Sequence, residues 1–215
     1  MIIEFIAVPG SGKTFFSDKL YTYLKKELKS KDVKLFNRHD INLIKNTKKP
    51  TTNKNLIRLN IIKQYLKVID FYLLKSLWRL FVSSPYPFKT KTNLAMYLLD
   101  IFSNYRIIND LKKTYNNKCL FVLDEGLLHA SSIGMDECNA ASLDLFYKNL
   151  KSTKWNINKS LFIFIDCDID TVYSRLSERT EDWPVNWRGL SSEEKREELD
   201  KSYRKFKAKK DYISQ

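Results

Sequence analysis

The sequence of 215 residues is poor in cysteine and histidine, and these shortages exclude several kinds of site. Its three cysteines are widely spaced and form no C-x-x-C pair, which argues against a disulfide framework and a zinc site. Only His39 and His129 are present, so a transition-metal site is not expected either, and we expect His129 to be structural. The composition therefore predicts a protein of a reducing compartment that is stabilised by its core.

Long apolar runs are also missing. No uncharged apolar stretch reaches the roughly 18 residues that a membrane-spanning helix requires. The opening apolar run is too short for a secretory signal, contains Glu4 and leads into a turn instead of a cleavage site. These features predict a cytoplasmic protein.

The length predicts one domain, and the charge leaves several explanations open, including a purely compositional one. With 43% hydrophobic residues, the chain can bury a sizeable core, and we expect a single α/β domain over 1–215. The net charge of +13 would suit a nucleic acid, a membrane or a polyphosphate. Because no aromatic-interleaved basic motif occurs, a nucleic-acid partner is not expected.

The most specific pattern stands at the beginning of the sequence. Residues 2–8 have the β-branched and aromatic side chains typical of a buried strand. A glycine-rich turn and the start of a helix follow, with the residues Pro9, Gly10, Ser11, Gly12, Lys13 and Thr14. A strand, a glycine-rich loop, Gly-Lys-Thr and a helix make up the phosphate-binding P-loop, although Ala7 replaces its usual first glycine.

This motif predicts that the protein binds ATP with Mg²⁺. Backbone N–H groups of the loop and the helix N-terminus would bind the phosphates. Lys13 would reach the β- and γ-phosphates, and the Thr14 hydroxyl would hold Mg²⁺.

A second motif would complete the metal site. Residues 120–123 are apolar and are followed by Asp124, Glu125 and Gly126, which predicts a buried parallel strand ending in carboxylates. Asp124 would order the shell of Mg²⁺ opposite Thr14. Glu125 would act as a general base, or receive a substrate hydroxyl or a lid arginine. A third buried strand is expected over 161–166.

Candidate acceptor-binding residues follow the short strand predicted over 33–36. Arg38 would hold an anionic acceptor, and Asp40 would either accept the proton of an attacking hydroxyl or cap the next helix. Residues 42–54 are polar and lysine-rich, which predicts a mobile connecting segment before the next helix. Arg106, on a helix expected over 93–115, would point into the acceptor pocket or into water.

The helix predicted over 56–82 has a broad apolar face with a narrow polar stripe. Such a face must be covered, either by the core, by a second copy in a homodimer, or by a membrane on which the helix lies peripherally.

The last part of the chain contains a candidate lid over 175–192. Arg175 and Arg179 lie one helical turn apart, and Arg188 follows in an irregular stretch. Ser191 and Glu194 form a capping box that begins a final helix. Arginines of a lid would stabilise a transferring phosphoryl group and exclude water. Alternatively, Arg175 and Arg179 are solvated and pair with nearby glutamates.

These motifs together resemble the P-loop kinases of the nucleoside and nucleotide kinase group, and thymidylate kinase most of all. The resemblance implies a three-layer P-loop NTPase fold with a short parallel sheet, a helical acceptor-side insertion over about 41–117 and an arginine-bearing lid. It assigns ATP phosphates to residues 10–14, Mg²⁺ to Asp124, and lid roles to the three arginines. The chain departs from thymidylate kinases in having Asp-Glu where they have Asp-Arg, and in lacking a clear fifth strand.

The leading hypothesis is an ATP- and Mg²⁺-dependent kinase that phosphorylates a small acceptor, either a hydroxyl or a phosphate. Three alternatives remain. A nucleoside monophosphate kinase would grip the acceptor phosphate with Arg38 and Arg106. A regulatory NTPase would use Glu125 to activate water. A kinase of a lipid-linked or glycan acceptor would dock through the 56–82 helix.

Overall fold

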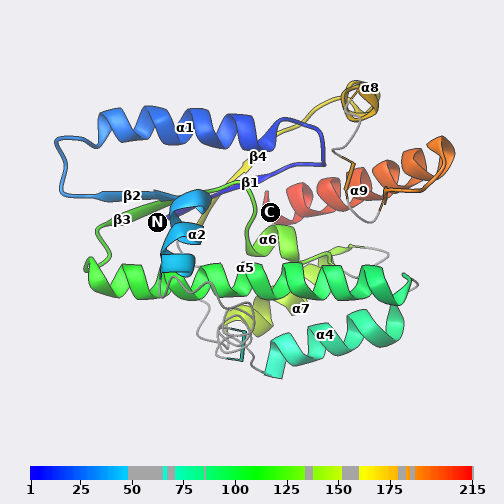
Figure 1. The fold of residues 1–215 in the computed structure, drawn as a ribbon, viewed down its shortest axis with the longest axis horizontal. Helices are drawn as coiled ribbons and strands as arrows, with labels where there is room; N and C mark the ends of the chain where they lie inside the picture. Colours follow the sequence, from blue (N-terminus) through cyan, green and yellow to red (C-terminus); the bar gives the residue numbers. More distant parts are fainter. Residues whose placement is uncertain are drawn as a thin grey trace.

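The strands of this protein form one parallel sheet (Figure 1). A computed structural model describes residues 1–47, 65–66, 71–84, 86–133, 138–151, 160–178, 183–184 and 187–214. The strands are β1 (Ile2–Ile6), β2 (Lys34–Asn37), β3 (Cys119–Leu123) and β4 (Ser160–Phe164). All pairings are parallel, in the order β2-β3-β1-β4. The prediction of an α/β fold with a short parallel sheet is confirmed, and the described residues contain no fifth strand.

Helices flank both faces of the sheet (Figure 1). Helix α1 covers one face, and α5, α6 and α9 lie on the other, where they pack against β1 and β3. The helices are α1 (Lys13–Glu27), α2 (Arg38–Thr47), α4 (Phe71–Ser83), α5 (Phe88–Thr114), α6 (Leu127–Ala130), α7 (Ala140–Lys151), α8 (Ile169–Glu178) and α9 (Ser192–Ile213).

The alternation of side chains along β1 assigns each residue to a face of the sheet. Ile3 and Phe5 pack with α1, whereas Ile2 and Ile6 face the helices on the opposite side. β1 and β3 are central and buried throughout, as their apolar sequences predict. β4 is less buried than expected, with Leu161 51% exposed, because it forms an edge of the sheet.

Two helix boundaries between residues 38 and 117, the region expected to bind an acceptor, differ from the sequence expectation. Helix α2 extends to residue 47, so residues 42–47 are helical and not a polar connection. Its anchor is Ile41, which is fully buried in the core cluster with α5. Helix α5 begins at Phe88, immediately after Pro87, because proline has no N–H to lose at a helix start.

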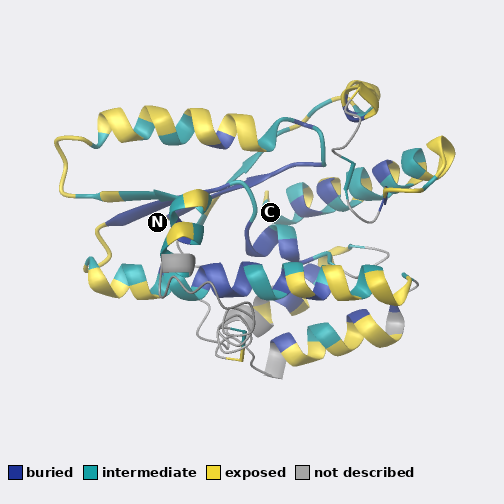
Figure 2. Ribbon diagram, in the orientation of Figure 1, coloured by how far each residue is buried: buried dark blue, intermediate teal, exposed yellow. Residues whose placement is uncertain are grey.

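Of the helix predicted over 56–82, the structure describes residues 65–66, which are helical, and residues 71–82, which belong to α4. The remainder lies outside the described residues. Leu73 and Leu80 are buried in the core, but Leu74 and Trp78 are exposed (Figure 2). The core therefore covers only one of the two apolar faces of α4. None of the described helices combines the length and the apolar character needed to cross a membrane.

The capping box at the start of α9 is confirmed and generates a stability prediction. The Ser191 hydroxyl accepts a bond from the Glu194 N–H at 3.2 Å, and the Glu194 carboxylate accepts one from the Ser191 N–H at 2.7 Å. Ser191→Ala should lower the free energy of unfolding by about 1 kcal/mol, because orphan N–H groups of the first turn lose a partner. Urea unfolding measures this, with Ser192→Ala as the matched control. Equal effects of both changes would contradict the prediction.

Candidate functional site

The loop between β1 and α1, residues 8–12, has a shape that only glycine accommodates well; we call it the glycine loop. Gly10 and Gly12 have φ values of 83° and 88°, in the left-handed region. A Cβ at Gly10 would lie 2.7 Å from the Leu176 side chain, so α8 packs directly onto the loop. The Ser11 hydroxyl donates to the Val8 carbonyl at 2.8 Å and fixes the turn. Helix α1 therefore starts directly after an ordered loop. The first N–H groups of α1 have no hydrogen-bond partner within the helix, as in any α-helix.

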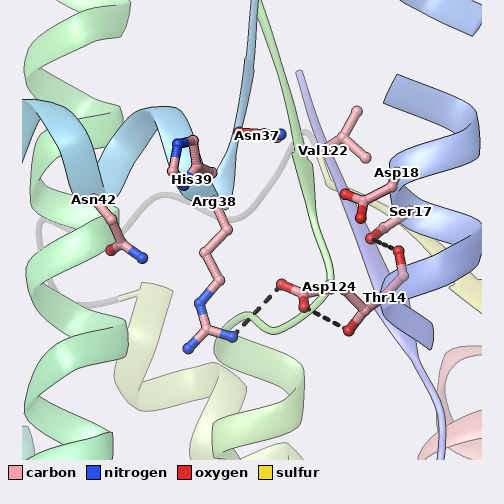
Figure 3. A pocket seen from close by; sticks show the side chains of 9 residues that line it. All are labelled: Thr14, Ser17, Asp18, Asn37, Arg38, His39, Asn42, Val122 and Asp124. Carbon is pink, nitrogen blue, oxygen red and sulfur yellow. Dashed lines mark hydrogen bonds and ion pairs between the residues drawn. The ribbon is translucent and has the colours of Figure 1, made fainter. Parts of the chain in front are cut away.

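The parallel pairing of β1 with β3 brings the two sequence motifs together. Glu4 is in register with Leu123, so the residues that follow β3 lie beside the glycine loop. The Thr14 hydroxyl donates to Asp124 Oδ2 at 3.0 Å (Figure 3). Lys13 Nζ lies 3.6 Å from Glu125 Oε1. Lys13 and Thr14, the two side chains expected to act on phosphate and metal, thus each contact the Asp-Glu pair.

The oxygens of Thr14 and Asp124 suit a hydrated magnesium ion. Asp124 Oδ1 is buried and, among the described residues, accepts no hydrogen bond. Magnesium in proteins takes one or two carboxylates and completes its shell with water and substrate phosphates. No group of three His, Cys, Asp or Glu side chains in the described residues forms a larger metal site. A carboxylate oxygen that accepts no hydrogen bond and has only the Arg38 guanidinium nearby, at 3.6 Å, fits this sparse ligand set together with the hydroxyl.

Glu125 is held between two cations. Arg38 Nη1 lies 2.5 Å from Glu125 Oε2 and 3.6 Å from Asp124 Oδ1. Burial opposes ionisation of Glu125, but Lys13 and Arg38 outweigh it and lower its pKa to about 2. Such a carboxylate is a weak proton acceptor near neutral pH. In this arrangement Glu125 positions Lys13 and Arg38, and the base role predicted for it stays a prediction. Among the described residues, the arginine that contacts Glu125 is Arg38, and the predicted contact with a lid arginine stays a prediction.

A cavity of about 260 Å³ opens beside Thr14 and Asp124. It lies between the first turns of α1, the end of β2 with the start of α2, and the end of β3 (Figure 3). Its walls present amides, hydroxyls and carboxylates with one guanidinium and one imidazole. The lining residues are Thr14, Ser17, Asp18, Asn37, Arg38, His39, Asn42, Val122 and Asp124.

Sequence reasoning found three of these lining residues, Thr14, Arg38 and Asp124, and missed others. Asp18 and Asn42 were overlooked. Each stands four residues after a predicted site residue on the same helix, where side chains share a face. Helical spacing from Thr14 and Arg38 would have identified both.

Asp40 has a capping role in the structure. Its Oδ2 accepts bonds from the Asn37 N–H at 3.0 Å and the Tyr21 hydroxyl at 2.9 Å, and its own N–H donates to Asn37 Oδ1 at 2.9 Å. Burial and the Asp40 carboxylate raise the pKa of Tyr21 to about 12. Asp40 is not among the cavity-lining residues, so the geometry favours the cap over the general base. Three other predicted arginines likewise lie away from the lining: Arg106 is half-buried on α5, and Arg175 and Arg188 are exposed.

The lid predicted over 175–192 is described only in part. Arg175 is on α8, the helix whose Leu176 packs against the glycine loop. Its Nη1 lies 3.8 Å from Cys167 Sγ. Arg188 Nε donates to the Trp183 carbonyl at 3.3 Å. Arg179 lies outside the described residues. The lid roles of these three arginines stay predictions.

Behind the Asp-Glu pair, Glu4 supports the turn that follows β3. The side chain is 1% exposed. Its carboxylate accepts bonds from the His129 N–H at 2.9 Å and the Tyr105 hydroxyl at 3.2 Å. A Cβ at Gly126 would lie 2.4 Å from Glu4 Cδ, which explains why glycine follows Asp-Glu. Burial raises the pKa of Glu4 to about 7 and lowers that of Lys209, which donates to the His129 carbonyl, to about 8.

No protein-family model matches this chain, and no curated protein matches it significantly. Functional inference therefore rests on the residues and their geometry.

The buried Glu4 generates a prediction on pH. Its pKa is near 4.5 when unfolded and about 7 when folded, so the folded protein binds the extra proton. The Glu4 contribution to stability is therefore complete below pH 4.5 and is lost as the pH rises through 7. Between pH 5 and 8, the free energy of unfolding should fall in the wild type relative to Glu4→Gln by about 3 kcal/mol.

Denaturant unfolding of both proteins across this range measures the difference. A difference that is constant with pH would show that Glu4 titrates as it does in the unfolded chain.

Proposed function

We propose that this protein is an ATP- and Mg²⁺-dependent kinase that transfers the γ-phosphoryl group to a hydroxyl of a small acceptor. The observation that carries the proposal is the 3.0 Å contact between Thr14 and Asp124 beside a loop with two left-handed glycines. A hydroxyl and a carboxylate from different elements meet where a helix N-terminus and Lys13 favour anions. This combination suits a nucleotide triphosphate with its metal.

On the donor side, the chain supplies positioning and positive charge. N–H groups of the glycine loop and the first turn of α1 would bind the phosphate oxygens, and Lys13 would leave Glu125 to contact the terminal phosphates. Thr14 and Asp124 would hold Mg²⁺, which neutralises charge on the β- and γ-phosphates. Glu125 keeps Lys13 close to this position before ATP binds.

On the acceptor side, the cavity favours a hydroxyl over a phosphate. Its one guanidinium, Arg38, is already paired with Glu125 and Asp124, so an acceptor phosphate would have to compete with two carboxylates. Asn37, His39 and Asn42 offer donors and acceptors that match hydroxyl groups. Asp18 lines the same cavity and is the residue that we assign to accept the hydroxyl proton.

The same contacts weigh against two alternatives. A nucleoside monophosphate kinase would need Arg38 and Arg106 free for a phosphate, but Arg38 is paired and Arg106 does not line the cavity. An NTPase that activates water through Glu125 would need this carboxylate free to bind the water, but its Oε2 is paired with Arg38 at 2.5 Å.

The donor side is tested with Lys13→Ala. ADP release is measured against a panel of nucleosides, sugars, glycans and nucleoside monophosphates, with and without Mg²⁺. Because Lys13 would stabilise charge on the transferring group, its loss should lower turnover about 10²-fold or more. Lys19→Ala, on the same helix, is the control and should leave turnover unchanged. ATP turnover that no acceptor changes would favour the NTPase.

The acceptor side is tested with two matched substitutions, once the panel has given an acceptor. Asp18→Asn should lower kcat by about 10²-fold or more, because it removes the proton acceptor. Asp40→Asn should leave kcat unchanged but lower the free energy of unfolding by about 1 kcal/mol through the weakened cap. The reverse pattern, with activity lost in Asp40→Asn alone, would return the base role to Asp40.

A further inference from the structure

Helix α4 and the start of α5 expose a contiguous set of large apolar side chains, which we call the α4–α5 patch. In Figure 2, exposed residues run along the outer side of α4. The Phe81 and Phe88 rings lie 5.9 Å apart, so the two helices contribute to one surface. The patch consists of Leu74 (52% exposed), Trp78 (72%), Phe81 (37%), Val82 (61%) and Phe88 (76%). Scattered apolar residues are normal on a surface, but a cluster with two phenylalanines and a tryptophan indicates a binding surface.

The charges around the patch all have one sign. Residues 71–99 contain no aspartate or glutamate, but they contain Lys75, Arg79, Lys89 and Lys91. Lys75 and Arg79 are exposed and each follows a patch residue, about 100° further round the helix. Lys89 is exposed and follows Phe88. Cations therefore flank the apolar stripe on the solvent side, and no acidic side chain of this segment neutralises them.

This combination argues against a second copy as the occupant. A two-fold dimer brings the same surface of both chains together. Pairing the α4–α5 patch with itself would bring the exposed Lys75, Arg79 and Lys89 of both copies into one interface without an acidic residue from this segment, and like charges at an interface are unfavourable. Lysine is moreover depleted at protein interfaces in general.

A bilayer with anionic lipids fits both features. Tryptophan and phenylalanine side chains partition into the boundary between headgroups and acyl chains, while lysine and arginine beside them reach the lipid phosphates. None of the described helices is able to span a bilayer, so the contact would be peripheral.

We propose that the α4–α5 patch docks this protein on the surface of membranes rich in anionic phospholipid. The apolar stripe inserts to headgroup depth, and Lys75, Arg79 and Lys89 lie against the phosphates. This proposal does not depend on the kinase assignment, because none of the patch residues lines the cavity beside Thr14.

The test is co-sedimentation of the full chain with vesicles at low salt. Vesicles of phosphatidylcholine alone are compared with vesicles that also contain phosphatidylserine. Binding should require phosphatidylserine and weaken as salt rises, since the attraction is partly electrostatic. Trp78→Ser with Phe88→Ser should abolish it, and Tyr23→Ser, an exposed aromatic on α1, should not.

A second pair separates a specific patch from the overall charge of +13. Lys75→Gln with Arg79→Gln should weaken binding about 25-fold, because each cation near the surface contributes about fivefold. Lys26→Gln with Lys29→Gln removes the same charge from the exposed end of α1 and should change little. All substituted residues are exposed, and an unfolding curve recorded for each variant tests that it folds.

Three results would overturn the proposal. One is the absence of sedimentation with phosphatidylserine vesicles at low salt. Another is an equal loss in the α1 control pair, which would reduce the effect to net charge. The third is a dimer, measured by sedimentation velocity, that dissociates when Trp78 is changed to serine, because the patch would then be a subunit interface.

Discussion

The side-by-side, parallel pairing of β1 and β3 is the constraint on which the candidate site depends. Because both strands end at the same edge of the sheet, the glycine loop and the Asp-Glu pair meet although 110 residues separate Thr14 from Asp124. The buried, alternating side chains of the two central strands fix their register. A slip of this register would separate hydroxyl from carboxylate and Lys13 from Glu125.

Two glutamates near this edge show how environment sets the chemistry of one side-chain type. Glu4 accepts hydrogen bonds from the neutral His129 N–H and Tyr105 hydroxyl, and burial raises its pKa to about 7 against the attraction of Lys209. Glu125 is also largely buried, but Lys13 and Arg38 lower its pKa to about 2. The first residue supports the turn with a carboxyl of variable charge, whereas the second is a fixed anion that organises cations. The different pKa values of the two glutamates therefore come from their surroundings and not from the side chain itself.

The acceptor side and the α4–α5 patch are built from the same group of helices. Helix α5 packs against β3, α2 and α4, so it links the cavity wall to the exposed patch. One face of α4 packs into the core through Leu73 and Leu80, whereas its outer face is exposed. The sequence shows a helix with two apolar faces, and only packing distinguishes the face that stabilises the fold from the face available to a partner.

The sequence by itself determined the parts that depend on neighbouring residues. The glycine loop, the buried strand before Asp124 and the Ser191 capping box are all readable from local spacing, because backbone conformation and periodicity are local properties. Tertiary structure alone decided the contacts between distant residues. These include the pairing of Arg38 with Glu125, 87 residues apart, and the contact of Glu4 with the turn at Gly126. Asp40 lies between the two cases, since its local sequence allowed both a cap and a base, and its contact with Tyr21 from another helix favours the cap.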